Sequence, residues 1–248
     1  NYNFFFVHKM ILKKSFNQDM SYKEELIETI GTNFIFSKSP LNRIKVKETQ
    51  VLKNYDKINK INELKKDINS IQNCKLNDNS SILIFGDGNI NSPIMIIGEA
   101  PGAEEERAKK TFQGDSGELL EKMLLAINLK KKDLYFSYAI NFRTPEDRKP
   151  TSQEIKRYSK FLKDHISIID PKIIILLGST AMEAVISSNQ KISQERGKWK
   201  EIILKNKTYP LMTTFSPSYL IRFPENKKFS WEDLKEIKQK ILDLKIQI

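Results

Sequence analysis

The pattern that most constrains the fold is a short, wholly apolar run that ends at a rigid turn. Residues 93–97 read Pro-Ile-Met-Ile-Ile and are followed at 98–102 by Gly-Glu-Ala-Pro-Gly. A run without alternation predicts a strand buried on both faces. The segments 134–140, 173–177 and 209–214 are similar, and amphipathic helical patterns separate them. This alternation predicts an α/β fold, a three-layer α/β/α sandwich with a mainly parallel four-stranded central sheet. Binding loops are then expected at the carboxyl ends of the strands.

The chain before these strands has a different organisation. Residues 1–19 are expected to be a weakly ordered extension, because Met20 and the residues after it read like a true start with a capping box. Residues 20–72 are predicted to form a helical N-terminal region, in which 45–71 has apolar residues at helical spacing on a lysine-rich background. Residues 73–248 are predicted to form the main domain.

The composition limits which binding partners and metal sites the protein can have. The formal net charge is +11, which favours a polyanion such as nucleic acid, although AT-biased coding, which enriches lysine, explains the charge equally well. The sequence has one cysteine, Cys74, and two histidines, so an internal disulfide and a complete cysteine-based metal site are excluded. No apolar run is long enough to span a bilayer. A cytoplasmic monomer that contacts no membrane is expected.

Two segments are suited to binding phosphate. Residues 216–222, Ser-Pro-Ser-Tyr-Leu-Ile-Arg, form a proline-anchored, hydroxyl-rich loop that ends in arginine. Gly114, Ser116 and Gly117 open a predicted helix, whose first N–H groups favour an anion. An ordinary helix cap would look the same, and the two interpretations are compatible.

These motifs together resemble family 4 of the uracil-DNA glycosylase superfamily, usually an iron–sulfur type. Phe112 follows Glu99 by thirteen residues, as in that family, and Trp231-Glu-Asp-Leu follows the arginine loop. The resemblance covers roughly residues 70–245. It implies base flipping and hydrolysis of the N-glycosidic bond of uracil in base excision repair.

The resemblance also implies the roles of individual residues. Glu99 and Ser216 are expected to be catalytic. The base is expected to contact Gly98, Ala100, Phe112 and Tyr138, with Phe112 stacking on it. Phosphate contacts and the wedge that fills the vacated stack are expected from Pro101, Gly102, Gly114, Ser116, Gly117, Pro217, Ser218, Leu220 (or Ile221) and Arg222.

Departures from the family pattern concern the cluster and the base. The four cluster cysteines of the family fall at Ile71, Cys74, Phe142 and Tyr158, so no 4Fe–4S cofactor is expected and the two aromatic rings are expected to fill its volume. The family's uracil-reading asparagine falls at Tyr138, and its histidine falls at Ser216.

Three functions therefore remain open at this stage. The first is a uracil-DNA glycosylase acting on single- or double-stranded DNA. The second is a weakened or inactive DNA-binding relative, which the residues at 138 and 216 favour. The third is an α/β nucleotide-binding protein, against which the lack of a Walker loop or dinucleotide fingerprint counts.

Overall fold

The computed structural model describes residues 43–71, 76, 82–188 and 190–247. The chain divides into two compact units, Asn1–Glu48 and Thr49–Ile248. The predicted extension over 1–19 and the predicted cluster position Cys74 lie outside the described residues. The domain boundaries at 19 and 72 stay predictions.

Within the described residues, one six-stranded sheet runs in the order β1-β3-β2-β4-β6-β5. Its strands are β1 (Gly86–Gly88), β2 (Ile94–Gly98), β3 (Tyr135–Tyr138), β4 (Ile173–Leu177), β5 (Trp199–Leu204) and β6 (Lys207–Thr214). The four predicted strands are β2, β3, β4 and β6, and they pair in parallel.

The prediction of four strands was wrong at the two edges. Strand β1 is only three residues long and contains two glycines, so its sequence reads as a turn. Strand β5 pairs antiparallel with β6 across a hairpin at Lys205 and Asn206, both at positive φ. Its residues alternate in exposure and include charged side chains, as edge strands do.

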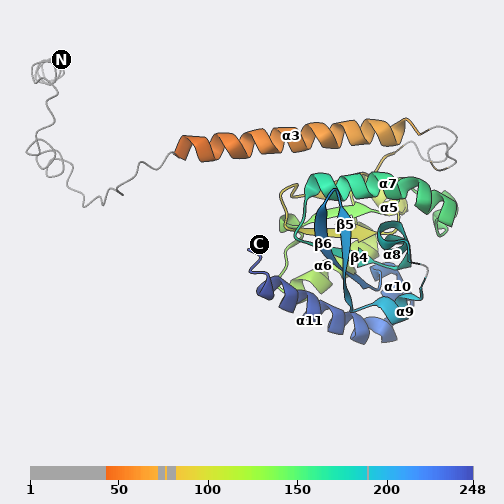
Figure 1. The fold of residues 1–248 in the computed structure, drawn as a ribbon. Coiled ribbons are helices and arrows are strands. Elements are labelled where there is room, and N and C mark those ends of the chain that lie inside the picture. The colour runs from red at the N-terminus through yellow and green to blue at the C-terminus, as the bar shows by residue number, and fades with distance from the viewer. Residues whose placement is uncertain (1–42, 72–75, 77–81, 189, 248) are drawn as a thin grey trace, which may run out of the picture. The chain divides into compact units, whose positions relative to one another are not determined.

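Helices cover both faces of the sheet (Figure 1). They are α3 (Arg43–Asn69), α5 (Ala103–Ala108), α6 (Gly114–Ala126), α7 (Ser152–Ile169), α8 (Ser179–Ile186), α9 (Ile192–Glu195), α10 (Pro217–Arg222) and α11 (Lys227–Asp243), with 3-10 turns at Lys131–Asp133, Pro145–Asp147 and Pro224–Asn226. Helices α7 and α8 lie on one side of the strands, and α6 and α11 lie on the other (Figure 1). None of the described helices is long and apolar enough to cross a membrane.

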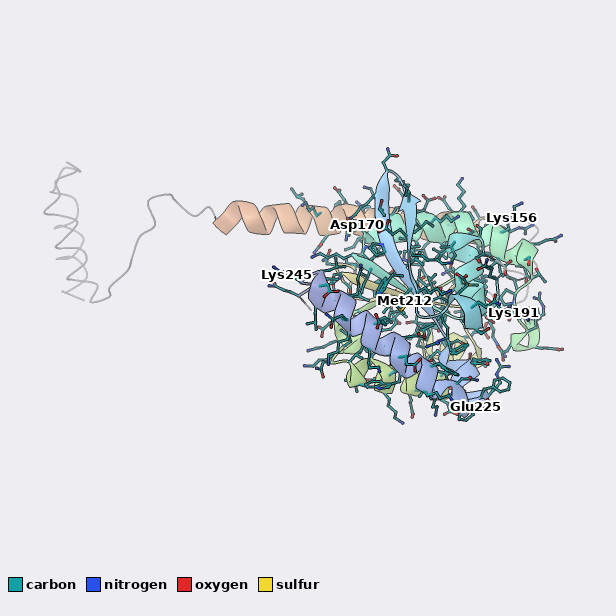
Figure 2. All side chains as sticks on the ribbon, turned by 60° about the horizontal axis from the view of Figure 1, so that its bottom comes forward. Lys156, Asp170, Lys191, Met212, Glu225 and Lys245 are labelled. Atoms are coloured by element: carbon teal, nitrogen blue, oxygen red, sulfur yellow. The ribbon has the colours of Figure 1, made fainter. Side chains whose placement is uncertain are left out.

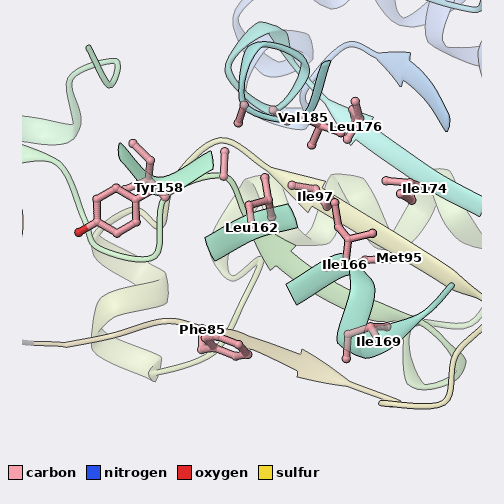
Figure 3. Packing of buried hydrophobic residues seen from close by; sticks show 14 of the residues in the cluster. Phe85, Met95, Ile97, Tyr158, Leu162, Ile166, Ile169, Ile174, Leu176 and Val185 are labelled. Carbon is pink, nitrogen blue, oxygen red and sulfur yellow. The ribbon is translucent and has the colours of Figure 1, made fainter. Parts of the chain in front are cut away.

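The middle strand shows why the fold has three layers. Met95 and Ile97 of β2 belong to the core beneath α7, with Leu162 and Ile166 (Figure 3). Ile94 and Ile96, the alternate residues, belong to a second core, which includes residues of α6 and α11. Because successive side chains of a strand point to opposite faces, an unbroken apolar run feeds both cores. Figure 2 shows α11 between the labels of Lys245 and Glu225, and Met212 of β6 belongs to the core on this side of the sheet.

The described end of α3 belongs to the same unit. Ile61, Leu64 and Ile68 are buried in the core on the α7 side. Lys57 donates to the carbonyl oxygen of Ile169, the last residue of α7, at 2.8 Å. A cation is favourable at a helix carboxyl end. The contact ties α3 to α7.

Candidate active site

A cleft of about 190 Å³ opens at the carboxyl ends of the parallel strands. It brings together residues that are far apart in the sequence, and most of those predicted for the site line it. These are Gly98, Glu99, Ala100, Pro101, Gly102, Phe112, Ser116, Tyr138, Ser216, Pro217 and Ser218. Lining residues to which the sequence analysis gave no role are Glu105, Thr144, Asp147, Arg148 and Leu177.

Two aromatic rings, Phe112 and Tyr138, pack against each other in the lining. Their centroids are 4.9 Å apart, with the planes tilted by 32°. A Cβ on Gly98 would lie 2.8 Å from Cζ of Phe112 and 2.9 Å from Cδ1 of Tyr138. Only glycine therefore allows the β2 strand end to approach both rings.

Gly117 has a similar packing role one turn into α6. A Cβ there would lie 2.1 Å from the carbonyl oxygen of Phe112. Gly117 is buried and does not line the cleft, so the glycine lets the Phe112 backbone close on the helix. Gly114 is exposed, stands at φ +62 and is also absent from the lining.

The Tyr138 hydroxyl already has partners. It accepts a hydrogen bond from the Phe112 N–H at 2.8 Å, and it pairs with the Glu105 carboxylate. Burial, together with the nearby charge of Glu105, raises its pKa well above the ordinary value for tyrosine. The phenol is therefore neutral, and both its donor and an acceptor site are occupied within the protein.

Glu105 organises this side of the cleft, and the sequence analysis missed it. The side chain is buried, and its oxygens accept from the Gly102 N–H and the Gln113 N–H, each at 2.9 Å. One carboxylate thus joins the loop before α5 to the loop before α6. The signal was present, since Glu105 stands at the capping-box position of a helix that starts after Gly102.

Glu99 is held from the opposite side. The Thr180 hydroxyl donates to its Oε2 at 2.5 Å, and Thr180 is fully buried at the start of α8. The Glu99 carbonyl accepts from the Ile140 N–H at 3.1 Å, so the β2 and β3 strand ends stay paired beyond the sheet. These contacts fix the carboxylate in the cleft.

Ser216 begins α10 as its N-cap. Its Oγ accepts from the Tyr219 N–H at 3.3 Å and lies 3.1 Å from the Oγ of Ser218. Gly178, at φ +94, comes so close that a Cβ there would lie 3.3 Å from the Ser216 Cβ. Since the cap uses an acceptor site of Ser216, its proton can be donated, either to Ser218 or to a ligand in the cleft.

The segment of the chain that builds this cleft is similar to known sequences. The family model described as "Uracil DNA glycosylase superfamily" matches residues 85–237. The chain belongs to the uracil-DNA glycosylase superfamily.

Curated relatives agree with this assignment. A Type-4 uracil-DNA glycosylase of Thermotoga maritima is 32% identical over 168 residues, covering 66% of this chain and 86% of the relative. A Type-4 enzyme of Sulfurisphaera tokodaii is 30% identical over 187 residues, covering 72% and 84%. A DNA polymerase of Bacillus phage SP01 is 32% identical over 150 residues, covering 60% of this chain and 16% of that protein.

Leu220 does not suit the wedge role predicted from the glycosylase resemblance. It is 1% exposed and packs in an apolar pocket with Leu119, Met123 and Leu234. The neighbouring Ile221 is 41% exposed and is the apolar side chain available to DNA. The helical turn of α10 decides this, because adjacent residues of a helix face different directions.

The loop after β3 supplies a charged rim. Arg143 donates to both oxygens of Asp147, at 2.7 and 2.9 Å, and to Glu106 at 3.2 Å. These hydrogen bonds lower the pKa of Asp147. Arg148 pairs with Glu154 at 2.7 Å, so both arginines stabilise the loop. Arg222, predicted to bind phosphate, is exposed outside the cleft lining, and its Nε donates to the Ser218 carbonyl at 3.4 Å.

Three of the positions implied for the family's cluster, Ile71, Phe142 and Tyr158, are described, and their side chains lie in or against the core. Phe142 and Tyr158 are fully buried, and their rings meet edge to face with centroids 6.3 Å apart. Ile71 packs against the same core. None of these three side chains offers a thiolate, the ligand that iron–sulfur clusters require. Among the described residues, no group of three or more histidine, cysteine or acidic side chains is arranged to hold a metal ion.

Proposed function

We propose that this chain is a uracil-DNA glycosylase that hydrolyses the N-glycosidic bond of a uracil flipped out of DNA. The observation that carries the proposal is the shared cleft, where the segments after β2 and β6 bring Glu99, Phe112 and Ser216 into one lining. An enzyme acting on a base must extrude it into such a pocket. The Type-4 relatives, named for this activity, support the same reaction.

Different residues of the cleft have different roles in the proposed reaction. Phe112 offers the aromatic surface for the flipped base, and the Gly98–Gly102 backbone approaches the sugar and phosphate. Ser216 donates to a carbonyl oxygen of the base as negative charge develops there. Because Ala100 carries no carboxylate to activate water, the barrier is lowered more by charge stabilisation than by a general base.

One assay tests the reaction. Oligonucleotides that contain uracil, hypoxanthine or only normal bases are incubated with the protein and then treated with alkali. We expect strand cleavage at uracil alone. An uncleaved uracil strand at high enzyme concentration would contradict the proposal.

A second candidate is a DNA-binding relative without significant activity. The observation that favours it is the Tyr138 hydroxyl, which is occupied by Phe112 and Glu105 and therefore has no pair of groups free to read a base. In the same assay, DNA binding without any abasic product would support this candidate.

We further propose that the protein works without a 4Fe–4S cluster, as a monomer in the cytoplasm. The buried ring pair of Phe142 and Tyr158 supports the first statement, because the two side chains use the volume as ordinary core. Iron analysis of purified protein tests it, and stoichiometric iron with visible absorbance would contradict it. Light scattering at several concentrations tests the monomer.

A further inference from the structure

Three aromatic side chains form a stack along α10, the helix whose first residues, Pro217 and Ser218, line the cleft. The ring centroids of Phe215 and Tyr219 are 4.8 Å apart at an interplanar angle of 22°, and those of Tyr219 and Phe223 are 4.9 Å apart at 39°. Residues four apart on a helix are neighbours, which explains the spacing. The inner ring, Phe215, is buried, and the outer ring, Phe223, is 44% exposed.

Side chains of the neighbouring segments hold the inner two rings of the stack in place. The Arg196 guanidinium lies 5.7 Å from the Phe215 ring and is itself paired with the buried Asp233 at 2.7 Å. The Asn226 side chain donates to the Tyr219 hydroxyl at 3.2 Å. The outer ring is thus presented on a rigid base, so little conformational freedom would be lost when a ligand covers it.

Charge around the outer ring favours a polyanion. Arg222, Lys227 and Lys228 are exposed on either side of it in the sequence, and Glu225 is the acidic residue among them. Figure 2 places Glu225 at the end of the molecule where α11 begins. Three cations against one anion complement a phosphate backbone.

The stack also lies at a useful distance from the cleft. Phe223 comes five residues after Ser218, which lines the cleft. Phe223 is the C-cap of α10, and five residues at 1.5 Å per helical residue rise about 7.5 Å along the axis, or about two base steps of 3.4 Å. A DNA strand that holds one nucleotide in the cleft and continues along α10 would bring a neighbouring base near Phe223.

We propose that Phe223 stacks on an unpaired base close to the extruded nucleotide and that single-stranded DNA is the preferred substrate. The inference rests on the proposed function, because it places a DNA strand at the cleft. Both faces of a base inside a duplex are covered by its neighbours, whereas a base in a single strand offers a free face. Aromatic stacking of this kind tolerates any sequence.

Binding to DNA without uracil tests the proposal. Fluorescence anisotropy compares the intact protein on a labelled oligothymidine strand and on the same strand in a duplex. We expect the wild type to favour the single strand. Phe223→Ala should bind that strand about tenfold more weakly, the loss of one stacked base, and the duplex less than twofold more weakly. Phe223→Trp should restore single-strand binding.

Ile203→Ala is the matched control. Ile203 is 73% exposed on β5, opposite Thr208 at the start of β6, and so lies near the amino ends of the parallel strands, the opposite end of the sheet from the cleft. Its removal should change neither affinity. Unchanged single-strand binding by Phe223→Ala, an equal loss on the duplex, or no restoration by Phe223→Trp would each overturn the proposal.

The experiments distinguish a failure of the stacking proposal from a failure of the proposed glycosylase activity. Phe223-dependent binding without uracil excision would contradict only the glycosylase activity. Excision that is indifferent to Phe223 and to strandedness would contradict only the stacking site.

Discussion

Replacing Glu105 by glutamine is expected to destabilise the protein more than the same replacement of a neighbouring glutamate. The carboxylate is 8% exposed and accepts two backbone N–H groups, from Gly102 and Gln113. In Glu105→Gln, the amide oxygen can accept one of them, but the amide nitrogen then faces the other donor. One buried N–H loses its acceptor, and the remaining bond is no longer charge-assisted.

The magnitude follows from those two losses. An unsatisfied buried donor costs about 1–3 kcal/mol, and the weakened bond adds to it, for a total of about 3 kcal/mol. For a domain of this size, that corresponds to a fall in Tm of about 6–12 °C. Urea unfolding followed by circular dichroism measures the free energy of unfolding directly.

Glu104→Gln on the same helix is the control. Glu104 is exposed and pairs only with Arg107 on the surface, so its replacement should cost less than about 0.5 kcal/mol. Equal destabilisation by the two variants would show that the backbone bonds to Glu105 do not hold the cleft, and the reasoning would fail.

Three further outcomes are expected. Burial of His165 lowers its pKa from 6.5 to about 3, so the unfolded chain binds a proton that the folded protein does not. The contribution of the neutral imidazole to stability is present above pH 6.5 and is lost as pH falls toward 3, by up to about 1.4 kcal/mol per pH unit. Urea melts at pH 4 to 7 should record this loss of stability, and His165→Gln should weaken the pH dependence. Leu220→Ala should cost about 2–5 kcal/mol in unfolding free energy, because the side chain is buried. Ile221→Ala should leave stability unchanged and slow uracil excision from duplex DNA, and the reverse pattern would exchange the roles of the two residues. Ser216→His with Tyr138→Asn should raise kcat/KM for uracil about 100- to 1000-fold, and unchanged kinetics would show that another part of the site limits the reaction.

Much of the site could be read from short motifs. The Gly98–Gly102 turn and the Ser216–Ser218 loop each follow an apolar strand, and parallel strands put their carboxyl ends on one edge. Their convergence in one cleft was therefore predictable. The two edge strands were not, because β1 is short and glycine-rich and β5 alternates like an exposed segment.

The sequence by itself determined the four parallel strands with the main helices between them, the loops that approach one another and the family. It could do so because hydrophobic periodicity and glycine or proline turns are local properties of the chain. Only the tertiary structure decided that Leu220 is buried while Ile221 is exposed, that Glu105 joins two loops, and that the Tyr138 hydroxyl is already paired. Those outcomes depend on which side chains meet across tens of residues, and packing rather than local pattern determines such contacts.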